Sequence, residues 1–131
     1  MKVGEARVLV RSAINESRRM RALQSSQVNE ITLWLSGHLA KTESGVGQAY
    51  LFGSVIHRDY PTSDVDVALL FNDMADKEYT RKERRLAPVS RDFEKTFQKP
   101  LHFQRFLATE VEAFREFISK QSEPVLVISD E

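Results

Sequence analysis

The sequence predicts a mixed α/β domain of the α+β kind, with a small sheet of about four strands and helices packed on it. Stretches with helical apolar spacing alternate with short strand-like apolar runs. The 131 residues are enough for one domain with a single core. Hydrophobic residues make up 41% and charged residues 29% of the chain, as in ordinary soluble globular proteins. We therefore expect one domain over residues 1–131, with an N-terminal helical segment at 5–40 and a core at 49–129.

The N-terminal segment is expected to contain two helices. Residues 5–23 carry an apolar stripe at helical spacing. Ser25 and Ser26 then offer an N-cap for a second helix that ends near Leu39. The apolar face of this second helix consists of Val28, Ile31, Leu35 and Leu39.

The core is expected to alternate strands with helices. Strands are predicted at 49–52, 64–71, 100–107 and 124–129. The last of these is expected to be an edge strand, because proline is tolerated at the start of such a strand and Pro124 begins it. A charged helix is predicted at 77–86, and Pro88 either kinks it or begins a second segment through Phe97. Thr109 and Glu112 have capping-box spacing, which predicts a further helix.

Two aspartates on the second strand are the most informative residues of the chain. Asp64 and Asp66 are two positions apart, so their side chains point to the same face of a strand. Neighbouring carboxylates repel unless a cation or a proton lies between them, and Mg²⁺ is commonly held by one or two carboxylates plus substrate phosphates. Gly53 allows a sharp turn and close approach to a ligand, and the Ser54 hydroxyl and nearby N–H groups could bind an anion. Together these residues would suit a metal–phosphate complex.

This stretch resembles the signature of the DNA polymerase beta-like nucleotidyltransferase superfamily. In that signature an apolar residue, a glycine, and a glycine or serine precede a spacer and then Asp, an apolar residue, and Asp or Glu. Here Phe52-Gly53-Ser54 is followed by nine residues and then by Asp64-Val65-Asp66-Val67. Ser63 stands directly before the first aspartate, as in many members. The chain length and element order are similar to those of minimal nucleotidyltransferases, small prokaryotic proteins often partnered with a HEPN-type protein.

The resemblance implies a nucleotidyltransferase fold, here with extra N-terminal helices, and a mechanism. Two Mg²⁺ ions would bridge Asp64, Asp66 and a nucleoside triphosphate, and an acceptor hydroxyl would attack the α-phosphate and expel pyrophosphate. Gly53 and Ser54 would hold the β- and γ-phosphates, and Ser63 and Arg58 would also contact the nucleotide. The transferred group would be a nucleoside monophosphate, most often AMP from ATP. The acceptor could be a HEPN-type partner, which would make the protein an antitoxin.

The third carboxylate of the family pattern is missing. The family usually supplies it from a neighbouring strand, yet residues 100–107 contain no Asp or Glu. The best-matching position is His102, which is a poor ligand for Mg²⁺. Three alternatives remain open: His102 substitutes with reduced efficiency, Glu94 or Glu110 reaches in, or the domain binds nucleotide or a partner without turnover.

Bulk properties narrow the function classes. Lys plus Arg and Asp plus Glu both number 19, so net charge does not indicate nucleic-acid binding. The chain has no cysteine, no signal-peptide pattern and no membrane-spanning run, which predicts a cytoplasmic protein without membrane association. The basic residues at 81–85 form either a solvated helix face or a contact for phosphates or a partner. An aminoglycoside-type transferase is disfavoured, because those enzymes carry an additional substrate domain.

Overall fold

The structure, a computed structural model, describes residues 26–56 and 64–129. Its centre is a four-stranded sheet in the order β3-β2-β1-β4. The strands are β1 (Val46–Phe52), β2 (Val65–Phe71), β3 (Leu101–Phe106) and β4 (Val125–Ser129). β1 runs antiparallel to both β2 and β4, whereas β2 and β3 are parallel. The predicted mixed α/β class is confirmed, and β4 is an edge strand as expected.

Helices connect and cover the strands. The longer ones are a helix over residues 26–41, α2 (Asp76–Glu83), α3 (Leu86–Phe97) and α4 (Val111–Ser119). The chain also has two short 3₁₀ turns. The first, η1 (Gly53–Val55), follows β1, and the second, η2 (Ala108–Glu110), precedes α4. The helix predicted at 5–23 lies outside the described residues.

The bounds of β2, β3 and β4 lie within one residue of the prediction, whereas the start of β1 and the capping of α4 differ from it. β1 begins at Val46 rather than at residue 49, because Val46 pairs with Phe71 of β2. The capping box expected at Thr109 is wrong, since no side chain caps α4. Instead, the Glu110 carboxylate accepts a hydrogen bond of 2.9 Å from the Leu107 N–H at the start of η2.

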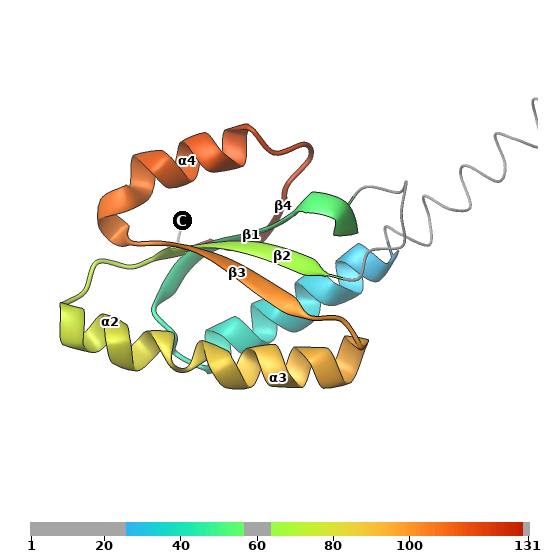
Figure 1. Cartoon of the computed structure of the whole chain (residues 1–131), viewed down its shortest axis with the longest axis horizontal. Helices are drawn as coiled ribbons and strands as arrows, with labels where there is room; N and C mark the ends of the chain where they lie inside the picture. Colours follow the sequence, from blue (N-terminus) through green and yellow to red (C-terminus); the bar gives the residue numbers. More distant parts are fainter. Residues whose placement is uncertain (1–25, 57–63, 130–131) are drawn as a thin grey trace, which may run out of the picture.

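The main core lies on one face of the sheet. Figure 1 shows the helix over residues 26–41 and α3 on this face, opposite to α4. Their apolar residues pack on alternate residues of β1 and β2, as the period-two alternation of strand side chains requires. The fully buried members of this core include Ile31, Leu35, Leu51, Val65, Val67, Leu69 and Phe93.

The other face of the sheet is only partly covered. Phe114 of α4 packs with Ala68 and Leu70 of β2 and with Phe106 of β3. This cluster lies at the C-terminal half of β2, so α4 covers that half. Asp64 and Asp66 belong to the same face but precede Ala68, and their side chains remain 45% and 32% exposed. The fold therefore leaves the carboxylates accessible beside the α4 cluster.

Candidate active site

The structure brings His102 next to both aspartates. Asp66 and His102 are register partners on the parallel strands β2 and β3, so their side chains emerge side by side on one face. His102 Nδ1 lies 3.7 Å from Asp66 Oδ1 and 4.0 Å from Asp64 Oδ2. Both distances exceed those of a hydrogen bond. The three groups thus surround a common space on the open part of the sheet.

Gly53 lies against the Asp66 carboxylate from the other side. Phe52, the last residue of β1, is the register partner of Asp66, and the chain turns into η1 at Gly53 with φ of +84°. A Cβ atom at Gly53 would lie 3.0 Å from Asp66 Oδ2, closer than side chains normally pack. The turn therefore needs glycine for two reasons, its left-handed backbone and the nearby carboxylate.

Two aromatic side chains from distant segments of the chain, Phe52 and Phe117, pack together beside the site. Phe117 of α4 meets Phe52 edge to face, with ring centroids 5.1 Å apart. Phe117 stands three residues after the buried Phe114, a spacing typical of one face of a helix, whereas nothing in the sequence indicates Phe52 as its neighbour. The contact positions α4 next to the carboxylates and limits how far the open face extends.

Electrostatics at the carboxylates favour binding of a cation. Partial burial raises the pKa of the Asp66 carboxyl, the nearby His102 imidazole lowers it, and the neighbouring Asp64 charge raises it; the net result is an increase. Ionisation of Asp66 is therefore less favourable in the folded protein than in the unfolded chain when no positive ion is present. A divalent cation between the carboxylates would reverse this penalty.

The raised pKa of Asp66 predicts a pH-dependent stability effect. Since the folded-state pKa lies above the unfolded value, Asp66 contributes stability below the unfolded pKa and loses that contribution as pH rises through the folded pKa. Asp66→Asn should therefore raise the melting temperature of the metal-free protein at neutral pH, because the amide has no charge whose partial burial is unfavourable. Thermal melts in the presence of chelator should show a smaller gain near pH 4. A variant that is less stable than wild type at neutral pH would contradict this prediction.

The donor set fits a divalent cation, although it is incomplete by itself. Within residues 26–56 and 64–129, no group of three or more His, Asp or Glu side chains could hold a metal ion. Asp64 and Asp66 supply hard oxygen donors on one accessible face, which is what Mg²⁺ and Mn²⁺ require. Further ligands would come from elsewhere, such as phosphate oxygens of a substrate.

Other residues expected near the site have different positions. Ser63 and Arg58 lie outside the described residues. Glu94 belongs to α3, on the face of the sheet opposite to α4 (Figure 1). The Glu110 carboxylate accepts the hydrogen bond from the Leu107 N–H. Neither glutamate lies with Asp64 and Asp66 in the structure.

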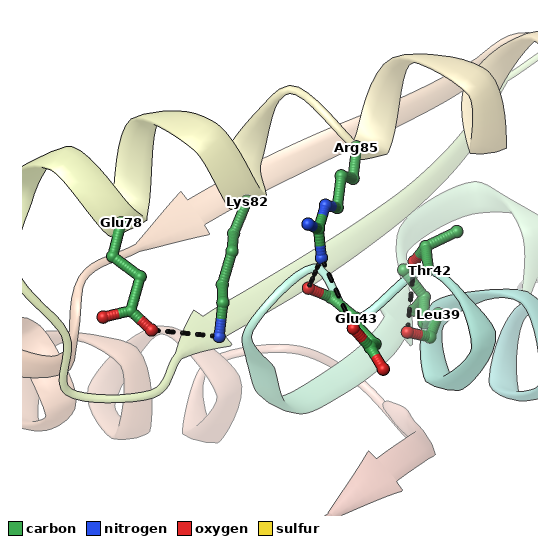
Figure 2. Close-up of polar contacts among 6 residues, drawn as sticks. All are labelled: Leu39, Thr42, Glu43, Glu78, Lys82 and Arg85. Carbon is green, nitrogen blue, oxygen red and sulfur yellow. Dashed lines mark hydrogen bonds and ion pairs between the residues drawn. The ribbon is translucent and has the colours of Figure 1, made fainter.

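Two of the basic residues at 81–85 form local contacts, Lys82 in α2 and Arg85 directly before α3. Lys82 Nζ lies 3.2 Å from Glu78 Oε1, one helical turn away (Figure 2). Arg85 Nη1 donates a hydrogen bond of 3.0 Å to the Glu43 carbonyl oxygen and lies 3.7 Å from the Glu43 carboxylate. α2 lies on the opposite side of the sheet from α4 (Figure 1). These contacts favour the interpretation of residues 81–85 as a solvated helix face.

Comparison with known proteins identifies the family. A family model described as "Polymerase beta, Nucleotidyltransferase" matches residues 37–131, which is more than half of the chain. The matched region includes Gly53, Ser54, both aspartates and His102. No curated protein matches the chain. None of the helices in the described part of the chain is long and apolar enough to cross a membrane.

Proposed function

Since the chain belongs to the polymerase beta-like nucleotidyltransferase superfamily, we propose that it transfers a nucleoside monophosphate from a nucleoside triphosphate to a hydroxyl group. The observation that carries this proposal is the pair of carboxylates at the start of β2, with Asp64 directly before the strand and Asp66 within it. Asp64 and Asp66 lie side by side there, and Gly53 approaches Asp66 so closely that no side chain fits between them.

In this proposal Asp64 and Asp66 hold a divalent cation next to the triphosphate. A bound cation supplies Lewis-acid polarisation of phosphate oxygens and neutralises the charge that develops on the leaving pyrophosphate. Gly53 and the exposed Ser54 lie at the turn after β1, where backbone and hydroxyl groups would face the β- and γ-phosphates. The protein's contribution is then mainly positioning and electrostatic stabilisation.

The finer assignments follow from the family resemblance. We propose ATP as the donor, AMP as the transferred group, and Mg²⁺ as the starting expectation for the cation. The proposed acceptor is a hydroxyl of a partner protein of the HEPN type, in the cytoplasm, in a toxin–antitoxin pair. Residues 1–131 would act as a single domain.

A second candidate function is a module that binds nucleotide or a partner without turnover. The observation that favours it is His102, which lies at the position on β3 where the family pattern has a carboxylate. A neutral imidazole there gives the cation one less negative charge than a carboxylate would. Binding without reaction would follow from this smaller charge, because charge neutralisation is a large part of the proposed catalysis.

The decisive experiment determines whether the α- or the γ-phosphate of ATP is transferred to the acceptor. The full chain is incubated with a divalent cation, a candidate acceptor protein, and ATP labelled at either the α- or the γ-phosphate. Nucleotidyl transfer predicts that the acceptor retains the α label only, while pyrophosphate is released. Retention of the γ label would contradict the proposal, because it indicates phosphoryl transfer. Nucleotide binding without label transfer or pyrophosphate release would favour the binding module.

A further inference from the structure

We propose that the outer face of α2 and α3 binds the phosphate backbone of double-stranded DNA without reading its base sequence. This face, the basic stripe, consists of five exposed residues: Lys77, Arg81, Arg84, Arg91 and Lys95. It lies on the side of the sheet opposite to α4, whereas Asp64 and Asp66 lie on the same side as α4 (Figure 1). The proposal goes beyond the proposed function, because it concerns a different surface and requires neither nucleotide nor transfer.

The five basic side chains share one side of a nearly continuous helical segment. α3 follows α2 end to end (Figure 1). Between them, the Arg85 N–H donates a hydrogen bond of 3.1 Å to the Lys82 carbonyl oxygen. The Ala87 N–H donates one of 3.3 Å to the Arg84 carbonyl oxygen, so the helical winding continues through the turn. Successive members of the stripe are four, three, seven and four residues apart, which keeps them on one face over about 27 Å.

The stripe keeps its positive charge in the free protein. Within the described part of the chain, none of its five side chains forms an ion pair or a hydrogen bond. Two carboxylates of α2 are engaged elsewhere, since Glu78 pairs with Lys82 and Glu83 lies 3.0 Å from Arg105 of β3. The remaining acidic residues of the two helices adjoin stripe residues in the sequence, so they lie about 100° around the helix and flank the stripe: Asp76, Asp92 and Glu94. The net charge of zero therefore conceals a local basic face.

The composition of this face favours a phosphate backbone over a protein partner. Three of its five residues are arginines, whose guanidinium groups can bind a phosphate through two hydrogen bonds. The large hydrophobic side chains that are exposed in the described residues, Leu33, Leu107 and Leu126, all lie outside α2 and α3. A protein interface usually has an apolar or aromatic centre, which this face does not offer. Charge contacts alone are enough to bind the DNA backbone independently of sequence.

The side chains near the stripe favour duplex DNA over other nucleic acids. Single strands usually bind by stacking on aromatic rings, yet the rings of α2 and α3 are buried or half-buried, namely Tyr79, Phe93 and Phe97. Duplex RNA is recognised partly through its 2′-hydroxyl groups. The hydroxyls next to the stripe, those of Thr80 and Thr96, donate to backbone carbonyls one turn earlier in their own helices. A stripe of about 27 Å is shorter than one turn of B-DNA, about 34 Å, so it can follow the backbone within a single turn.

Fluorescence anisotropy of a labelled DNA duplex of about 20 base pairs, roughly two turns, tests the proposal with the full chain and without nucleotide. The logarithm of the association constant should fall linearly with the logarithm of the salt concentration, with a slope of about −4 to −5 for five phosphate contacts. Two duplexes of unrelated sequence should bind equally. In Arg81→Gln with Arg84→Gln, the affinity at about 50 mM salt should fall by at least about tenfold and the slope should become shallower by about 2. Arg91→Gln with Lys95→Gln should have a similar effect.

Two basic residues of α4 provide the matched control. Arg115 and Lys120 are exposed, and each lies within about 3 Å of a glutamate of its own helix. Arg115→Gln with Lys120→Gln removes the same two charges from the chain but should retain the wild-type affinity and slope. Absence of DNA binding at low salt, unchanged binding in Arg81→Gln with Arg84→Gln, or equal losses in this variant and the α4 control would overturn the proposal. Binding of an RNA duplex or of polyglutamate at least about tenfold more tightly than DNA would also overturn it.

The outcome is separable from that of the proposed function. Arg81→Gln with Arg84→Gln should transfer label to an acceptor protein at the wild-type rate. DNA binding that this variant loses, in a chain that transfers no label, supports the basic stripe and rejects the transferase. Label transfer by a chain that binds no DNA supports the transferase and rejects the stripe.

Discussion

Asp66→Asn is expected to lower the rate of nucleotidyl transfer by at least about a thousandfold, which corresponds to about 4 kcal/mol of transition-state stabilisation. The amide keeps the shape of the carboxylate but loses the charge that would hold the cation beside the triphosphate. Asp66 lies between Gly53 on one side and His102 on the other, and its side chain is 32% exposed, so a bound cation would contact this carboxylate directly. Asp64→Asn should have an effect of the same order. Rates of label transfer at saturating nucleotide and cation measure both.

Loss of folding would not explain that effect, because Asp66→Asn is expected to be at least as stable as wild type. Asp73→Asn is a matched control: Asp73 is exposed in the segment between β2 and α2, beyond the far end of the strand. It should transfer label at the wild-type rate. An Asp66→Asn variant that keeps more than about a tenth of the wild-type rate would show that this carboxylate does not hold the essential cation.

The strands around the aspartates could be predicted from the sequence because their pattern is strong. Asp64 and Asp66 alternate with Val65 and Val67, which places the carboxylates on one face and the valines in the core. The resemblance to the family signature then predicted that these carboxylates hold divalent cations. The start of β1 could not be predicted in the same way, since Gly45 and Gly47 flank Val46 and suggest a loop. Cross-strand pairing with β2 overrides that local preference.

The arrangement within the candidate site required the structure. The sequence indicated His102 as the residue that replaces a carboxylate, but the distances from its imidazole to both aspartates depend on the parallel register of β2 and β3. The close approach of Gly53 to Asp66 likewise depends on how β1 pairs with β2. Such long-range pairings are not encoded in any local pattern of residues.

Gly53→Ala is expected to reduce cation binding and transfer by about tenfold, because the Asp66 carboxylate has to give way by a few tenths of an ångström at the reacting site. The new Cβ atom would lie 3.0 Å from Asp66 Oδ2, so the carboxylate has to move away from its position beside His102. The backbone adds a second cost, since φ of +84° is unfavourable for alanine by about 1–2 kcal/mol. Cation affinity and transfer rate should both be measured well below the melting temperature.

Gly45→Ala separates the two contributions. Gly45 also has a left-handed backbone, with φ of +79°, and a Cβ atom there would lie 2.6 Å from Met74 Cε. It precedes β1, whereas Gly53 follows it, so the strain at Gly45 does not reach Asp66 directly. Gly45→Ala should therefore destabilise the fold but retain cation affinity and the transfer rate of the folded fraction. If the two alanine variants lost affinity and rate equally, backbone strain rather than contact with Asp66 would explain the need for glycine at position 53.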